Sequence, residues 1–200
     1  MPFYRFLRAA SWPVVCGLFR LRATGMENVP ATGGGVLAAN HVSNFDPWPL
    51  GMPLYPRQLR FMGKSELFNP LLTPFLRAGG AFPVQRGKAD LAAIETAVEL
   101  VRTGELVMMF PEGTRRKKGL AKKYQPRPHS GAARIALEAR APLIPAAICG
   151  MDSLLRLGPL RVGYGPPVPV DDLFDQEPKQ AARIATERLM AAIERLKAAL

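Results

Sequence analysis

Two side chains close together in the sequence, His41 and Asp46, have the chemistry of a general base and of the acid that orients it. On a helix their spacing of five would turn them about 140° apart, and on a strand they would lie on opposite faces. Only a tight turn could pair them, and Ser43, Asn44 and Pro47 are typical of turns. A carboxylate on one imidazole nitrogen fixes the tautomer, so the other can take a proton from a hydroxyl. The alternative is an ordinary loop histidine beside an aspartate that caps a helix.

A second group of polar residues lies in the segment 110–115, Phe-Pro-Glu-Gly-Thr-Arg, which directly follows a predicted strand. The Pro-Glu-Gly turn should present Glu112, Thr114 and Arg115 at the end of the sheet. The planar guanidinium of Arg115 suits a phosphate, and backbone N–H groups beside Gly113 could help to hold an anion. The alternative is a surface turn with an internal Glu–Arg pair.

A further arginine, Arg86, comes just past the end of another predicted strand, 81–84. Taken alone it is one more exposed arginine. A phosphorylated ligand, however, needs a fixed cation, and Arg86 and Arg115 are then the two candidates.

A framework of alternating strands and helices must position these groups. Short apolar runs predict strands at 36–40, 59–62, 81–84, 105–110, 143–148 and, at an edge, 160–163. Helices are predicted over 65–77, interrupted by Pro70 and Pro74, and over 89–101, 131–139 and 178–200. A proline-rich loop is expected from 47 to 56. The pattern indicates one α/β domain with a central, largely parallel mixed β-sheet flanked by helices.

The composition excludes several classes of protein. The chain has 200 residues, 48% of them hydrophobic, which is ample for a core. A mean hydropathy near zero argues against a disordered chain and against a polytopic membrane protein. Cys16 and Cys149 lie far apart, so a disulfide framework is not expected and reducing cytosol is the default compartment. With only His41 and His129 beside them, a structural zinc site is not expected either.

The net charge of +11 requires an anionic partner: nucleic acid, an acidic membrane surface or a phosphorylated substrate. The charge is unevenly distributed. Residues 1–24 contain four arginines and no acid, and residues 115–127 contain seven lysines and arginines and no acid.

Residues 1–24 read as an amphipathic membrane-interface segment preceding a domain of residues 25–200. The apolar run is too short to cross a bilayer, which takes about 20 residues, and Pro13 and Gly17 interrupt it. It ends in Arg20-Leu21-Arg22 rather than in a small-residue cleavage site, so a signal peptide is not expected. An interfacial helix would place Trp12 and the phenylalanines in lipid and the arginines near headgroups. The alternative is a core helix docked on the domain.

Four blocks of this sequence resemble, in order and approximate spacing, those of the glycerolipid acyltransferases. The blocks are His41-x4-Asp46, Phe82 to Arg86, Phe110 to Arg115, and Leu143-Ile144-Pro145, with Lys64-Ser65-Glu66-Leu67 matching a stretch between the first two. The similarity covers about residues 25–170 and is greatest to the bacterial 1-acylglycerol-3-phosphate acyltransferases. It implies a glycerol-3-phosphate acyltransferase-like fold and a peripheral protein on the cytoplasmic face of the cell membrane.

The resemblance also implies a reaction. His41, oriented by Asp46, would deprotonate the sn-2 hydroxyl of lysophosphatidic acid, and the alkoxide would attack the thioester of acyl-CoA or acyl carrier protein to give phosphatidic acid. The positions matched to binding the acceptor's glycerol phosphate are Arg86, Glu112, Gly113, Thr114 and Arg115. Lys64 and Pro145 are further expected contacts with substrate or donor. No metal or organic cofactor and no acyl-enzyme is implied, and Cys16 and Cys149 lie outside every block.

Alternatives remain at this stage. The stretch before Gly131 carries His129 where relatives often have Lys, and residues 116–127 are unusually basic, so another lysophospholipid or a glycolipid could be the acceptor. A basic nucleic-acid-binding module would explain the charge, but residues 115–127 offer only Tyr124 for stacking, so no nucleic-acid partner is expected. An inactive, membrane-associated homologue is the third alternative, and the presence of both His41 and Asp46 argues against it.

Overall fold

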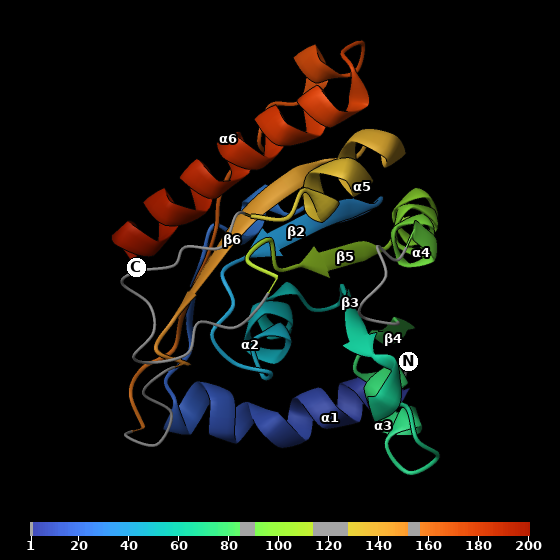
Figure 1. Ribbon diagram of the computed structural model, residues 1–200. Helices are drawn as coiled ribbons and strands as arrows, with labels where there is room; N and C mark the ends of the chain where they lie inside the picture. The colour runs from blue at the N-terminus through green and yellow to red at the C-terminus, as the bar shows by residue number, and fades with distance from the viewer. Residues whose placement is uncertain (1, 85–90, 114–127, 152–156) are drawn as a thin grey trace, which may run out of the picture.

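The computed structural model describes residues 2–84, 91–113, 128–151 and 157–200, and Figure 1 shows a single sheet with helices on both faces. The strands are β1 (Arg22–Thr24), β2 (Gly35–Ala39), β3 (Leu59–Lys64), β4 (Ala81–Val84), β5 (Leu106–Met109), β6 (Leu143–Cys149) and β7 (Arg161–Tyr164). The α-helices are α1 (Pro2–Trp12), α2 (Pro47–Gly51), α3 (Thr73–Ala78), α4 (Leu91–Arg102), α5 (Gly131–Ala139) and α6 (Pro178–Ala199). Short helices of other types are η1 (Pro13–Leu18), η2 (Met26–Asn28), η3 (Met52–Leu54), η4 (Ser65–Leu67) and η6 (Asp171–Leu173).

The strand order is β1-β7-β6-β2-β5-β3-β4. The five strands from β6 to β4 are mutually parallel, β7 is antiparallel to β6, and β1 is parallel to β7. The mixed, mostly parallel sheet and its flanking helices confirm the predicted fold class. Every residue of β2 is buried, as expected for a central parallel strand covered on both faces.

Two strand expectations need correction. β7 was expected at an edge, but β1 pairs outside it. β1 itself was not predicted, because its three residues, Arg-Ala-Thr, alternate between exposed and half-buried positions and form no apolar run.

The expectation of a loop from 47 to 56 is also wrong over residues 47–54, which form α2 and η3. Pro47 and Pro53 fall in the first turn of these short helices, where a backbone N–H has no intrahelical partner, so proline costs little there. The interruption expected within 65–77 is confirmed: η4 and α3 are separate, and Pro74 lies in the first turn of α3.

The two faces of the sheet hold two apolar clusters. One face packs against α4, α5 and α6 (Figure 1), and Val36, Ala38 and Val107 belong to the cluster on that face. The opposite face carries Leu37, Ala39, Leu106, Met108 and Ile144 and is covered by α2. Residues next to one another on β2 therefore serve different cores.

The N-terminal helix lies beneath α2, on the side away from the sheet (Figure 1). It continues from α1 through the π-helical η1 to Leu18. Tyr4 and Val15 are buried, the Tyr4 ring meets the Trp48 ring edge-on, and Trp48 Nε1 donates to Ser11 Oγ at 3.0 Å. Among the helices of the described residues, none has the length and apolar character needed to span a membrane.

Candidate active site

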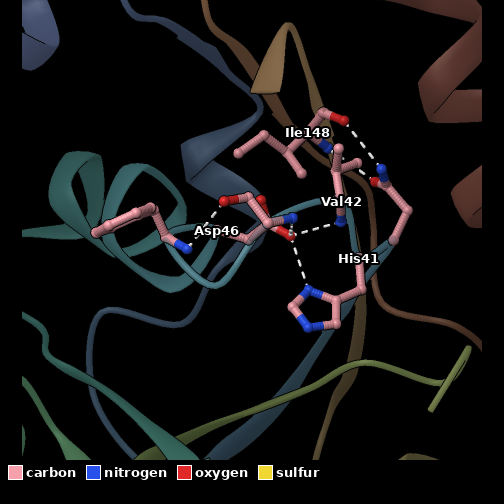
Figure 2. A network of polar contacts seen from close by, with 7 residues as sticks. His41, Val42, Asp46 and Ile148 are labelled. Atoms are coloured by element: carbon pink, nitrogen blue, oxygen red, sulfur yellow. Dashed lines mark hydrogen bonds and ion pairs between the residues drawn. The ribbon is translucent and has the colours of Figure 1, made fainter. Parts of the chain in front are cut away.

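The His41 and Asp46 side chains meet just beyond the end of β2 (Figure 2). Asp46 Oδ2 lies 2.8 Å from His41 Nδ1 and accepts hydrogen bonds from the backbone N–H groups of Val42, at 2.7 Å, and Ser43, at 2.9 Å. The Asp46 side chain is completely buried. Because the carboxylate is an acceptor, the imidazole proton belongs on Nδ1, which leaves Nε2 with its lone pair.

The pairing depends on the tight turn that the spacing of five required. Asp46 N donates to Ser43 O at 3.1 Å, and Phe45 N donates to Ser43 Oγ at 3.3 Å. Asp46 then directly precedes α2, and Leu50 N donates to Asp46 O. The Asp46 side chain does not cap that helix but turns back to the loop, so the alternative of a simple helix cap is not what the geometry shows.

Two neighbouring residues that sequence reasoning left without a role hold this corner in place. The buried side chain of Asn40 donates to Ile148 O and accepts from Ile148 N, both at 2.9 Å, which extends the pairing of β2 with β6 past the end of the strand. The Phe110 ring stacks on the imidazole of His41, with centroids 4.0 Å apart and planes 18° apart. A buried amide must find partners, so an asparagine ending an apolar run was the available signal for Asn40.

These contacts leave only the Nε2 side of the His41 ring open to a substrate. Asp46 occupies one edge of the ring and Phe110 one face, and the side chain is only 13% exposed. Within the described part of the chain no hydrogen bond reaches Nε2, and Figure 2 shows this nitrogen on the side of the ring away from Asp46. A substrate hydroxyl is the kind of group that Nε2 could bind and deprotonate.

The turn after β5 lies next to this pair. Glu112 is buried, and Gly113 adopts a left-handed conformation with φ +68°, donating its N–H to Phe110 O at 3.0 Å. His129 N donates to Pro111 O at 2.7 Å, and its ring covers Gly113 so closely that a Cβ there would lie 2.3 Å from His129 Cδ2. Glycine is therefore required by both the backbone angle and the space.

Of the other expected site residues that the structure describes, Lys64 lies on the same edge of the sheet as His41 and Pro145 lies on the face covered by α6. Lys64 ends β3 at the same carboxyl edge of the sheet, exposed and paired with Glu66 at 3.1 Å. Pro145 faces α6 instead, where it lines a groove of about 560 Å³ on the other face of the sheet from His41. Arg86, Thr114 and Arg115 lie outside the described residues. Among the described residues, no group of three or more His, Cys, Asp or Glu side chains is arranged to hold a metal ion.

Comparisons with known proteins agree with this architecture. The family described as "Acyltransferase" matches residues 20–149. The chain is 35% identical over 175 residues to a 1-acyl-sn-glycerol-3-phosphate acyltransferase of Bacillus subtilis, covering 86% of this chain and 85% of that protein. It is 26% identical over 166 residues to the enzyme of that name from Streptococcus pneumoniae, covering 80% of this chain but 60% of the relative.

A solved structure shares the fold. The crystal structure of the 1-acyl-sn-glycerophosphate acyltransferase PlsC from Thermotoga maritima superimposes with a TM-score of 0.64 at 23% identity, covering 98% of this chain and 88% of the other. The family match spans β1 to β6, and with them both the His41–Asp46 corner and the Gly113 turn. The protein is an enzyme of the acyltransferase family.

Proposed function

We propose that the enzyme moves a fatty acyl chain from acyl-CoA or acyl carrier protein to the sn-2 hydroxyl of 1-acylglycerol-3-phosphate, giving phosphatidic acid. The family and the names of the relatives support the reaction class. The observation that carries the chemistry is the 2.8 Å contact between His41 Nδ1 and the buried Asp46 carboxylate, which leaves Nε2 to act on the acceptor hydroxyl.

The reaction is a single displacement at the thioester carbonyl. Nε2 of His41 takes the hydroxyl proton as the oxygen attacks the carbonyl carbon, and the C–O bond forms. The tetrahedral intermediate then collapses, the C–S bond breaks, and the imidazolium returns its proton to the departing thiolate. No acyl-enzyme forms and no oxidant is needed. General-base catalysis of this kind contributes about 10²–10⁴ in rate, and orientation of the two substrates adds to it.

Asp46 acts through the ring rather than on the substrate. Its Oδ2 already accepts two backbone N–H groups in addition to Nδ1, so the carboxylate is held in place before the substrate binds. A buried negative charge beside the imidazole stabilises the positive charge that forms on the ring as the proton is taken. Phe110 restricts the His41 ring by stacking on it, and Asn40 fixes the end of β2 through its hydrogen bonds to Ile148.

We propose that the acceptor's glycerol phosphate binds at the carboxyl ends of β4 and β5, on the same edge of the sheet as His41. Arg86 and Arg115 would supply the cations, with Glu112, Gly113 and Thr114 forming the turn beside them. Lys64 is a third candidate cation, since it ends β3 between these two strands. Pro145 faces α6, away from this acceptor site, so its expected contact with the acyl donor stays a prediction.

The thioester brings an already activated acyl group, so the proposed reaction needs neither a metal nor an organic cofactor. The acceptor is a membrane lipid and the donors are water-soluble thioesters. We therefore propose that the enzyme works as a peripheral protein on the cytoplasmic face of the membrane, with no nucleic-acid partner. A different lysophospholipid or a glycolipid is the second candidate acceptor, and the packing of His129, rather than Lys, on the Gly113 turn favours testing it.

A panel of acceptors offered with one acyl-CoA, followed by thiol release, tests the proposal. We expect release with lysophosphatidic acid to exceed release with a lysophosphodiester or a glycolipid, and no release without acceptor. His41→Ala should lower kcat at least about 10³-fold while leaving the circular dichroism spectrum unchanged. Equal turnover by His41→Ala and the parent would refute the role of His41. Faster thiol release with another acceptor would refute lysophosphatidic acid as the preferred substrate.

A further inference from the structure

Large apolar side chains are exposed along one side of the molecule, on two segments far apart in the sequence. The first is the outward side of the N-terminal helix, and the second is the segment 67–75, which leads into α3. We call the exposed set the apolar rim; its members are Phe3, Phe6, Trp12, Val14, Leu18, Leu67, Leu71, Leu72 and Phe75. Leu71 is 77% exposed and Phe6 is 64% exposed, and exposed apolar side chains gathered in this way mark an interaction surface, whereas single ones do not.

The two segments are in contact, so the rim is continuous. The Phe3 ring packs against Phe75 with centroids 5.5 Å apart and against Phe6 at 6.3 Å. Figure 1 shows α1, α3 and the loop before α3 together along the lower side of the molecule, away from the sheet.

The inner side of α1 fixes which side faces outward. Tyr4 and Val15 are buried, and Ser11 accepts a hydrogen bond from Trp48 on α2. Arg8 reaches inward to Met52 O at 3.4 Å and lies over the Tyr55 ring at 4.4 Å. The helix is therefore docked on one side, and the apolar side chains on the other side are exposed in a fixed orientation.

The charges around the rim select the partner. Arg5 on α1, Arg20 just after Leu18 and Arg77 on α3 are exposed beside the rim. Glu66, which adjoins Leu67, is paired with Lys64 at 3.1 Å. Exposed apolar side chains bordered by such cations complement the headgroups and acyl boundary of an anionic bilayer. A neutral or basic protein surface would not be attracted to this set of charges.

We propose that the segment 67–75 inserts shallowly into the same anionic bilayer as the outward side of α1. This inference rests on the proposed function only in assuming that the acceptor is a membrane lipid. A protein that touches the bilayer through one interfacial helix can roll as a whole about the axis of that helix. A second contact offset from that axis prevents rolling, and would hold the His41 edge of the sheet at a fixed height above the lipid.

Vesicle binding tests the second contact. We would measure co-sedimentation with vesicles of phosphatidylcholine and phosphatidylglycerol for the parent, Leu71→Ser/Leu72→Ser, Phe6→Ser and Leu91→Ser. Leu91 is 58% exposed on α4, away from the rim, so it is the matched control. We expect the double variant to bind at least about tenfold more weakly, because two leucines lose their transfer into lipid, and Leu91→Ser to bind like the parent.

Several results would overturn the proposal. One is vesicle binding by the double variant equal to that of the parent, whether or not Phe6→Ser binds more weakly. Another is a dimer in solution that the double variant dissociates without any change in vesicle binding, which would assign the rim to a second copy. Should the double variant fail to fold by circular dichroism, quenching by brominated lipid of Leu71→Trp compared with Leu91→Trp decides the same question.

A separate measurement keeps this inference apart from the proposed reaction. With a short-chain acceptor dissolved in water below its critical micelle concentration, Leu71→Ser/Leu72→Ser should release thiol at the parent's rate. With the acceptor embedded in vesicles its rate should fall. Absence of thiol release by the parent would refute the reaction and leave the vesicle-binding result intact, whereas equal rates on vesicles for variant and parent would refute the inference.

Discussion

The two faces of the sheet are covered in very different ways (Figure 1). On one face, α4, α5 and the long α6 pack closely through buried alanines such as Ala97, Ala133 and Ala185, with Leu189 and Ile193 filling the space between them. On the other face, the short, proline-rich α2 covers the sheet, and α1 lies against α2 rather than against the strands. One face is thus covered by three packed helices and the other mainly by one short helix, and we call them the helical face and the thin face.

His41 and Asp46, the pair that we propose to react, lie on the thin face. His41 stacks on Phe110, which packs with the cluster on that face, and its partner Asp46 immediately precedes α2. The pair is held by local hydrogen bonds within one turn rather than by a large core. We therefore expect substitutions in the helical face to lower stability without changing the proposed chemistry, and substitutions in the turn to do the reverse.

Asp46→Asn should have the largest effect. The asparagine oxygen can still accept the N–H groups of Val42 and Ser43, so the turn should fold. The negative charge beside His41 is lost, together with the preference for a proton on Nδ1. We expect kcat to fall about 10³–10⁴-fold, measured by thiol release, with little change in the denaturation midpoint.

Asp172→Asn is the matched control for this substitution. Asp172 is an exposed carboxylate on η6, where Arg188 of α6 binds it at 2.7 Å and lowers its pKa. Its loss should leave kcat unchanged, because the pair lies beside α6 and not at the His41 corner. A comparable loss of kcat in both variants would mean that the effect of Asp46→Asn is general rather than local to His41.

Leu189→Ala should lower the stability of the protein and leave kcat nearly unchanged, the reverse of Asp46→Asn. Leu189 is completely buried in the cluster between α6 and the sheet. Removing its branched end should lower the free energy of unfolding by about 3 kcal/mol, measured with denaturant. The kcat of the folded protein should stay within about twofold of the parent value at a temperature well below the transition. A large fall in kcat would show that the helical face is coupled to the site.

Much of the fold could be predicted from the sequence, because buried parallel strands are continuous apolar runs and α4 and α6 repeat their apolar residues at helical spacing. Two elements were missed for identifiable reasons. β1 is a three-residue strand with no apolar run, and its pairing with β7 joins residues far apart in the sequence. α2 carries Pro47 and Pro49, which read as breakers although the first turn of a helix tolerates them.

The site was partly predictable. The spacing of His41 and Asp46 showed that only a turn could pair them, and the structure contains that turn. The stacking of Phe110 on His41 could not be anticipated, because it depends on the register that places the end of β5 beside the end of β2. The side of the sheet on which Pro145 lies could not be predicted for a similar reason: a strand residue can face either side, and only the packing of α6 decides which.

Gly113→Ala should have the smallest of these effects, on the thin face. A left-handed φ of +68° costs an alanine about 1 kcal/mol, and the new Cβ would also meet the His129 ring at 2.3–2.4 Å. His129 is exposed and can move in part, so we expect a total loss of about 2 kcal/mol in unfolding free energy. Because the turn adjoins the His41 corner through Phe110, kcat/KM should also fall, by about tenfold.

Gly33→Ala separates the two contributions. Gly33 has a similar φ of +76°, but a Cβ there would meet nothing within 4 Å, so only the backbone cost of about 1 kcal/mol applies and kcat/KM should not change. When His129→Ala is added to Gly113→Ala, the unfolding free energy should rise by the difference between the Gly113→Ala and Gly33→Ala variants and by no more. Equal losses in Gly113→Ala and Gly33→Ala would mean that His129 does not pack on the turn. Full recovery of kcat/KM by His129→Ala would show that the steric contact, rather than the backbone angle, links this turn to the His41–Asp46 pair.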